Sequence, residues 1–302
     1  MKSVLFKLLS GWTFLSLTQI SFAINPLQNQ LDTLIRKYNA KIGVAIRFDN
    51  QETITVNDHI QYAMLSTFKF PLALAVLNTL DKNGLPLNTE IYVTASDLLH
   101  DTYSPLRDVR PEGNFKIGIN ELLKYSVSLS DNNACDILIK YLGGPAVIQN
   151  YLTISGISGI TIIATEEMMH RTTNPYLNQA HPSAAVKLLE KFVNKTLLSA
   201  PYQDFLEKIM LETTTGPDKL KGLLPSATPV GHKTGSSDRN ADGLKAADND
   251  MGFVLLPNGK HFTIAVFIMD SMENDKTNAS IIAKIAKAAY DYYSDPKTKN
   301  HE

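Results

Sequence analysis

The chain has 302 residues, of which 44% are hydrophobic and 20% are charged, and its formal net charge is −1. This is an ordinary globular composition, and the length suffices for a large core in one domain or two. The balanced charge, without a long run of one sign, argues against nucleic acid as a main partner.

The first 23 residues have the composition of a secretory signal peptide. Lys2 and Lys7 precede an apolar stretch, which ends in small residues at the −3 and −1 positions of a cleavage site after Ala23. We therefore predict a signal peptide over residues 1–23 and a mature start near Ile24. An uncleaved membrane anchor is the alternative, but the apolar run is short and contains Ser, Thr and Gln. No later segment reaches membrane-spanning length.

The first expected elements are a helix, two strands and a second helix, over residues 26–40, 42–48, 53–56 and about 65–82. A polar turn at residues 49–51 joins the two strands. Pro71 lies inside the early turns of the second helix, where we expect it to disturb the hydrogen bonds.

The pattern from residue 97 to about residue 212 is mostly helical. Asn120 is expected to cap one helix, and a polar break at residues 130–132 precedes another that ends at Gly143. Residues 161–181 are irregular and polar, and long loops of this kind are often functional. Two further helices are expected, over residues 182–198 and 201–212.

The last part of the chain returns to strands, over residues 230–235, 251–256 and 261–269, and closes with a helix over residues 279–293. Strands at both ends predict one antiparallel five-stranded sheet, flanked by the N- and C-terminal helices. The domain organisation follows from this layout. Residues 24–63 and 213–302 would form a discontinuous α/β domain, and residues 64–212 an inserted helical domain.

The stretch LSTFKFPLALAVL places Ser66 and Lys69 one helical turn apart at the start of an otherwise apolar helix. Such a pair is either a nucleophile beside a base, or only a helix cap and a lysine that extends to solvent. The single cysteine, Cys135, permits no internal disulfide, and its apolar surroundings in sequence indicate a buried side chain.

Three separated motifs decide between these interpretations: Ser66-Thr67-Phe68-Lys69, Ser130-Asp131-Asn132 and Lys233-Thr234-Gly235. Each is weak alone. In this order they match the S-x-x-K, S-D-N and K-T-G set of the active-site serine penicillin-recognising enzymes. The chain resembles a class A serine β-lactamase over its whole mature length. The stretches SDNNACDILIKYLGG, EEMMH, MLETTTG and VGHKTGSS are most similar to the VEB/PER branch of extended-spectrum enzymes.

This resemblance implies a catalytic site built on four residues. Ser66 would attack the β-lactam carbonyl and form an acyl-enzyme. Lys69 could be its base if burial and neighbouring charge lower the lysine pKa. Ser130 would donate a proton to the leaving ring nitrogen. The loop at residues 161–181 resembles the family's omega loop, with Glu166 as the base that activates the deacylating water.

Glu167 is the competitor for that last role. Glu166 is preferred because the family's loop pairs its glutamate with a polar residue four positions later, which here is His170. Most class A enzymes have asparagine at that position, whereas the VEB/PER branch has histidine, so His170 would support the loop and the water.

The resemblance also implies substrate-binding residues: Tyr103, Asn132, Lys233, Thr234 and Ser236. Tyr103 would stand at the cleft entrance, and Asn132 would bond the substrate's amide side chain. Lys233 and Thr234 would hold its carboxylate. The backbone N–H groups of Ser66 and Ser236 would form the oxyanion hole.

A second departure from the family follows the K-T-G motif. Residues 236–249 are longer than expected and lack a clear match to the usual carboxylate-binding arginine. Arg239 or Lys245 is the candidate substitute. A longer loop at the strand edge would widen the cleft for oxyimino-cephalosporins.

No cofactor and no metal are expected, because the histidines lack metal-binding spacing. The expected partners are β-lactam substrates, with no stable membrane association, and the resemblance implies a periplasmic monomer. A D-Ala-D-Ala peptidase or penicillin-binding protein, or a penicillin-sensing module, would share the three motifs but acylate without turnover. A noncatalytic secreted protein would require the motifs to be accidental.

Overall fold

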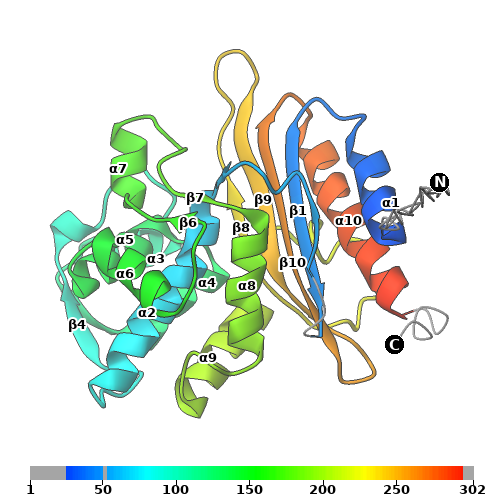
Figure 1. The fold of residues 1–302 in the computed structure, drawn as a ribbon. Coiled ribbons are helices and arrows are strands. Elements are labelled where there is room, and N and C mark those ends of the chain that lie inside the picture. The colour runs from blue at the N-terminus through cyan, green and yellow to red at the C-terminus, as the bar shows by residue number, and fades with distance from the viewer. Residues whose placement is uncertain (1–24, 50–52, 295–302) are drawn as a thin grey trace, which may run out of the picture.

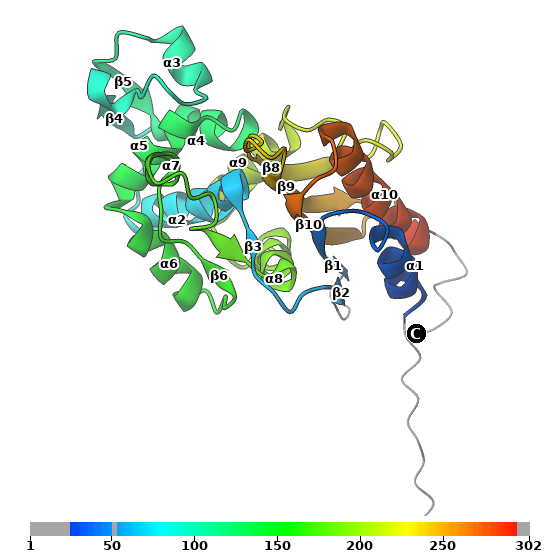
Figure 2. The same ribbon diagram turned by 90° about the horizontal axis from the view of Figure 1, so that it is seen from above.

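The protein is described by a computed structural model that places residues 25–49 and 53–294. The predicted signal peptide and part of the turn at residues 49–51 lie outside the described residues. The described chain forms three layers, with one sheet between two layers of helices (Figure 1). Helices α1 (Pro26–Ile35) and α10 (Asp275–Ser294) cover one face, and α8 (Pro182–Val193) with the other helices covers the opposite face (Figures 1 and 2).

The main sheet has five strands in the order β2-β1-β10-β9-β8, and every neighbouring pair is antiparallel. This confirms the predicted fold class and the pairing of strands from both chain ends. The strand bounds are β1 Lys41–Phe48, β2 Ile54–Val56, β8 Val230–Ser236, β9 Lys245–Leu255 and β10 His261–Ser271. β10 and β9 are buried almost throughout because helices pack on both of their faces.

The helices between β2 and β8 form the second body of the structure, drawn on the left of Figure 1. The 3₁₀ turn η1 (Leu65–Phe68) leads into the central helix α2 (Lys69–Lys82), whose apolar residues are nearly all buried. The remaining helices are η2 Ala95–Asp97, α3 Pro105–Val109, α4 Ile119–Ser128, α5 Asn132–Leu142, α6 Pro145–Ile154, α7 Glu166–Arg171 and α9 Ala200–Leu211.

Two small sheets were not expected from the sequence. One pairs β3 (Tyr62–Ala63), β7 (Gln179–Ala180) and β6 (Ile160–Thr161), and the other pairs β4 (Glu90–Val93) with β5 (Phe115–Gly118). Their strands are only two to four residues long, too short to give a clear period-two pattern. The first of them ties both ends of the predicted omega loop to the segment before η1.

Three local expectations were wrong. Asn120 does not cap a helix: α4 begins at Ile119, and its first N–H groups bond instead to backbone oxygens of Leu87 and Thr89. Helix α1 ends at Ile35, because the following residues turn into β1. Pro71 causes no break, since the α-helix begins only at Lys69 and a proline in the first turn removes no helical hydrogen bond.

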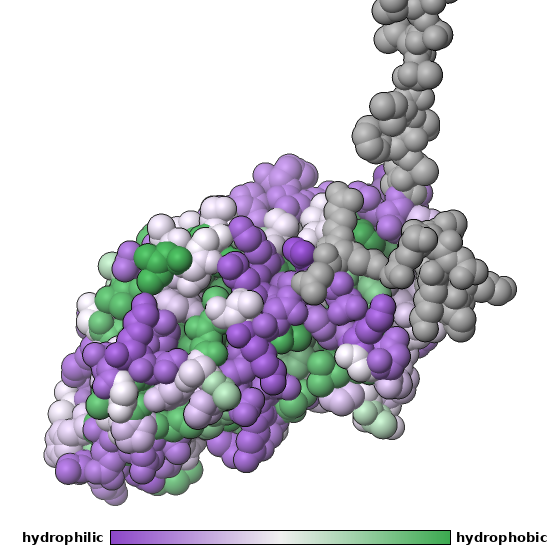
Figure 3. All heavy atoms as spheres, turned by 60° about the horizontal axis from the view of Figure 1, so that its bottom comes forward, coloured by the Kyte–Doolittle hydropathy of each residue, from purple (hydrophilic) through white to green (hydrophobic). Residues whose placement is uncertain are grey.

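Two groups of buried apolar side chains, one on each side of the sheet, make up the core. The exposed face in Figure 3 is mostly hydrophilic, and the apolar side chains of the described residues occur there in small groups between polar ones. Of the helices among the described residues, none is long and apolar enough to cross a membrane.

Candidate active site

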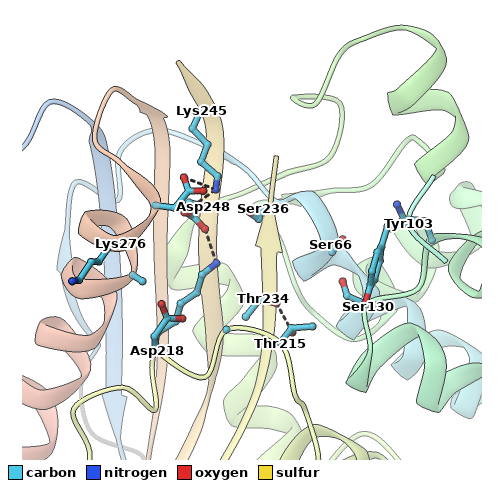
Figure 4. Close-up of a pocket in the computed structure, with 15 residues that line it drawn as sticks. Ser66, Tyr103, Ser130, Thr215, Asp218, Thr234, Ser236, Lys245, Asp248 and Lys276 are labelled. Carbon is cyan, nitrogen blue, oxygen red and sulfur yellow. Dashed lines mark hydrogen bonds and ion pairs between the residues drawn. The ribbon is translucent and has the colours of Figure 1, made fainter. Parts of the chain in front are cut away.

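The three sequence motifs and Glu166 meet at one place in the structure. Ser66 lies in η1 and Lys69 opens α2, Ser130 lies between α4 and α5, and Glu166 opens α7. These residues come from segments as much as 100 positions apart. Figure 4 shows Ser66 and Ser130 facing the end of β8 that carries Thr234 and Ser236, with Tyr103 on their far side.

Lys69 is the centre of the polar cluster. Its side chain is fully buried, and Nζ lies 3.1 Å from Ser66 Oγ, 2.8 Å from Ser130 O, 2.5 Å from Asn132 Oδ1 and 2.9 Å from Glu166 Oε1. Ser66 Oγ also donates to Glu166 Oε1 at 3.2 Å. The serine hydroxyl therefore touches both a buried ammonium and a carboxylate, so Ser66 is no helix cap and Lys69 does not extend to solvent.

Burial and the charges of this cluster shift the pKa values of Lys69 and Lys233 in opposite directions. Burial disfavours the Lys69 ammonium, but nearby acidic groups, Glu166 foremost and then Asp131, more than offset it, and the pKa of Lys69 lies above its ordinary value. Burial together with repulsion from Lys69 holds the pKa of Lys233 well below the usual range. The condition for Lys69 to act as a free base, a lowered pKa, is therefore not met while Glu166 is ionised beside it.

Ser130 connects the second lysine to the site. Lys233 Nζ donates to Ser130 Oγ at 2.9 Å, and Thr234 Oγ1 lies 2.7 Å from Thr215 Oγ1. Ser130 has a left-handed backbone, with φ of 61°, which directs the segment after α4 back toward Lys69. Asp131 fixes this segment between the start of α3 and the start of α5, because its buried carboxylate accepts from Ser104 Oγ, Leu106 N and Ala134 N.

Gly235 allows β8 to approach the turn at Ser66 closely. A Cβ atom at this position would lie 2.5 Å from Met64 O, 3.0 Å from Thr67 N and 3.1 Å from Ser66 N. No other side chain fits against a backbone at that distance. The residue after it, Ser236, thereby brings its own backbone to the same mouth as Ser66, where both line one cavity.

The segment over residues 161–181 is fixed at its neck by buried polar side chains. Asn178 Oδ1 accepts from Ile163 N at 2.9 Å and Ala164 N at 3.0 Å, and Asn178 Nδ2 donates to Ala164 O at 2.9 Å. Asp136 of α5 accepts from the backbone N–H groups of Glu166 and Glu167, each at 2.8 Å. Burial, together with the nearby Glu166 charge, raises the pKa of Asp136 to about 7.

The two glutamates at the start of α7 differ in exposure and in partners. The Glu166 side chain is 11% exposed and faces Ser66, whereas Glu167 is 38% exposed and pairs with Arg171 at 3.1 Å. His170 lines a cavity with Glu166, and its Nε2 lies 3.0 Å from Asp101 Oδ2. The ring thus joins α7 to the loop before Tyr103.

Two cavities adjoin the turn that carries Ser66. The first, about 530 Å³, runs from Ser66 past Thr234 to the start of α10. The second, about 600 Å³, lies between α7 with its following loop and the hairpin of β8 and β9. Tyr103 lines the first cavity, and its side chain is 58% exposed, as a residue at an entrance would be. Asn132 lines both, and its Nδ2 donates to Thr102 Oγ1 at 2.8 Å.

The first cavity contains a cation that the sequence reading missed. Lys219 lines it and is buried, with Nζ 2.6 Å from Asp248 Oδ1. Of the two predicted candidates, Arg239 lines only the second cavity and pairs with Asp275, while Lys245 lines the first cavity beside Lys219 and pairs with both Asp248 and Asp275. Lys219 lies in a loop of turns after MLETTTG, where no local sequence pattern marks it.

Two other predictions concern side chains outside this cluster. Cys135 is fully buried, as predicted, and burial raises the pKa of its thiol well above the usual value, which keeps it protonated. Among residues 25–49 and 53–294, no group of three or more His, Cys, Asp or Glu side chains could hold a metal ion.

Comparison with known proteins agrees with this arrangement. The profile described as "Beta-lactamase enzyme family" matches residues 26–293, and the chain belongs to this family. It is a class A β-lactamase, as the three motifs predicted.

The chain is similar to several named β-lactamases over nearly its whole length. The chain is 44% identical to a β-lactamase of Bacteroides uniformis, over 96% of this chain and 99% of the relative. It is 42% identical to β-lactamase VEB-1 of Pseudomonas aeruginosa, over 97% and 98%. The crystal structure of the TLA-1 extended-spectrum β-lactamase superposes with a TM-score of 0.88 at 46% identity, covering 89% of this chain and 98% of that one. The predicted resemblance to the VEB/PER branch is confirmed.

Proposed function

We propose that this β-lactamase opens the ring through a Ser66 acyl-enzyme, which water activated by Glu166 then hydrolyses. The observation that carries the proposal is the contact of Ser66 Oγ with both Glu166 Oε1 and Lys69 Nζ, at 3.2 and 3.1 Å. A serine hydroxyl needs a proton acceptor within hydrogen-bond reach to become a nucleophile.

In acylation, Glu166 takes the Ser66 proton while Oγ bonds the carbonyl carbon. Lys69 stays an ammonium and stabilises the negative charge, because Glu166 keeps its pKa raised. The backbone N–H groups of Ser66 and Ser236 bind the oxyanion, and each of these donors lowers the barrier by about 3 kcal/mol. Ser130 gives its proton to the ring nitrogen as the C–N bond breaks.

Ser130 recovers a proton from Lys233, which already donates to its Oγ at 2.9 Å. The lowered pKa of Lys233 makes that ammonium a better acid than an ordinary lysine. Lys69, 2.9 Å from Glu166, takes up the Glu166 proton while it gives one of its own to Ser130, and Ser130 returns a proton to Lys233. Both lysines are then ammoniums and Glu166 is a carboxylate again. Glu166 removes a proton from the water that attacks the ester and passes that proton to the leaving Ser66 Oγ. His170, beside Glu166, supports the loop that holds this water.

The substrate lies across both cavities. Its ring carboxylate is bound in the first by Thr234, Lys233 and Lys219. Its amide side chain bonds to Asn132 and extends into the second cavity of about 600 Å³. That volume is large enough for an oxyimino group, and we propose oxyimino-cephalosporins among the substrates, with Tyr103 at the entrance. The likeness to an extended-spectrum enzyme supports this.

The cellular setting is proposed from the sequence. Residues 1–23 would direct export and be removed, which leaves a monomer in the periplasm. The helical residues 64–212 would then form a domain inserted into the sheet domain, with the catalytic groups where the two meet.

The test is steady-state hydrolysis of nitrocefin, benzylpenicillin and cefotaxime by the mature protein, with Ser66→Ala as the inactive control and intact-mass detection of adducts. We expect sustained turnover of all three. A wild-type protein that stalls as a long-lived adduct would instead be a penicillin target or sensor. Turnover of benzylpenicillin without cefotaxime would contradict only the oxyimino assignment.

A further inference from the structure

The second cavity has two walls that come from different parts of the chain. Thr173, Pro175 and Tyr176 form the wall after α7, and residues 237–240 with Leu244 and Ala246 form the hairpin wall. The cavity can have a fixed width only if something holds these walls at a constant separation.

A hydrogen bond joins the first wall to the sheet. Tyr176 Oη donates to Asp270 Oδ1 of β10 at 2.6 Å, and Asp270 Oδ2 accepts from Lys41 Nζ of β1 at 2.8 Å. Burial, with the hydrogen bond to Asp270, raises the pKa of Tyr176 to about 12, so the phenol keeps its proton and remains a donor.

Asp270 points to this wall because its backbone departs from the strand pattern. In β10, Phe267 and Met269 face the helical layer, and Ile268 faces the α10 side. Regular alternation would turn Asp270 to the α10 side as well. Its φ of 53° is left-handed and reverses the alternation, so the next residue, Ser271, bonds Asn278 of α10 instead.

The same residue is in register with the other wall. β10 pairs with β9 at Met269↔Ala247 and at Ser271↔Lys245, which places Asp270 opposite Ala246. Ala246 lines the cavity at the base of the hairpin. Asp270 is thus connected to both walls: to the hairpin wall by the pairing of β10 with β9, and to the loop wall by the Tyr176 hydrogen bond.

The catalytic end of the loop is held separately. Asp136 fixes the backbone of Glu166, and Asn178 fixes the neck. Among the hydrogen bonds described for the segment between them, residues 172–177, the Tyr176 bond is the one that reaches the sheet, while Tyr176 and Leu177 also pack against the core. Release of that bond should therefore move the cavity wall and leave Glu166 in place.

We propose that Tyr176 and Asp270 form a latch that sets the width of the second cavity, which makes Asp270 a positioning residue that discriminates acyl side chains by size. The inference rests on the proposed function, in which this cavity receives the acyl side chain. A wall held in place before binding favours a bulky group that must contact it, and gives little to a small one.

The test compares Asp270→Gly with Lys41→Met, using KM and kcat for ceftazidime and benzylpenicillin. Glycine accepts the left-handed backbone and removes the carboxylate. Lys41→Met removes the outer ion pair and leaves the Tyr176 bond. We expect Asp270→Gly to raise the ceftazidime KM about 3- to 10-fold, as the loss of one hydrogen bond implies. Its kcat and its benzylpenicillin constants should change less than about twofold, and Lys41→Met should resemble wild type on both substrates.

An unchanged or lower ratio of the two KM values, or an equal loss on both substrates, overturns the proposal. Hydrogen exchange provides the readout that needs no substrate: amides of residues 172–177 should exchange faster in Asp270→Gly and in Tyr176→Phe, but not in Lys41→Met. Slow exchange in both latch variants refutes the latch. If wild type does not turn over ceftazidime but the exchange result holds, the oxyimino assignment fails and the latch stands.

Discussion

Replacement of Gly235 by alanine tests whether the oxyanion site depends on the close approach of β8 to the nucleophile turn. The added Cβ would lie 2.5 Å from Met64 O, about 0.9 Å closer than the 3.4 Å at which ordinary contacts begin. The neighbours are backbone atoms, so the strand itself must move. A displacement near 1 Å at a reacting centre can cost about 100-fold in rate. We therefore expect kcat for nitrocefin to fall about 100-fold in Gly235→Ala.

Gly231→Ala is the matched control, because it adds the same atom to the same strand away from the site. Its Cβ would lie 2.2 Å from Cζ of the Phe253 ring, in the core. That overpacking should cost about 1–3 kcal/mol of stability, with kcat of the folded enzyme within a few fold of wild type. The assay is nitrocefin turnover per folded enzyme, with the folded fraction from thermal unfolding. Wild-type kcat in Gly235→Ala, or an equal loss in Gly231→Ala, would refute the reasoning.

Three further results are expected. Because the pKa of Lys233 is lowered, its ammonium is lost at a lower pH than that of an ordinary lysine, so KM for benzylpenicillin should rise as the pH increases through that pKa. In Lys233→Arg the side chain stays charged, and KM should depend less on pH. A wild-type KM that does not change with pH contradicts this prediction. Lys219→Met should raise KM about tenfold or more with little change in kcat, and Arg239→Met should not; equal effects would remove Lys219 from carboxylate binding. Asp131→Ala leaves three buried donors unpaired and should lower the free energy of unfolding by about 3–5 kcal/mol in urea titrations, and a loss below about 1 kcal/mol would contradict the role of its hydrogen bonds.

The sequence predicted the elements whose local pattern is strong. β10 is a long apolar strand and the second half of β9 is apolar, whereas the polar first half of β9, residues 245–250, was missed. Helix α5 has an Asp131 cap and a left-handed Gly143 at its end, which are local signals. The short strands of the two small sheets have no such signal, because tertiary contacts specify them. Asn120 was misassigned for the same reason, since distant backbone oxygens replace its cap.

The site residues were predictable from motifs, but their electrostatics were not. Ser66, Lys69 and Lys233 are marked by their spacing, whereas the direction of each lysine pKa depends on distances to Glu166 and on burial. Lys219 was missed because no local pattern sets apart a lysine in a loop. The fold places it in the site, where its Nζ lies 2.6 Å from Asp248 Oδ1 of β9.

The central claim is that Glu166 activates the water of deacylation. The most direct measurement is time-resolved intact mass of Glu166→Gln with benzylpenicillin, beside wild type. In this variant Lys69 loses the largest charge that raises its pKa, while burial still acts to lower it, so we expect Lys69 to replace Glu166 as the base for Ser66. Acylation should continue while hydrolysis of the ester stops. We predict a stable adduct of one substrate mass on Ser66 in Glu166→Gln and no adduct in turning-over wild type. Glu166→Gln that turns over at the wild-type rate would contradict the account.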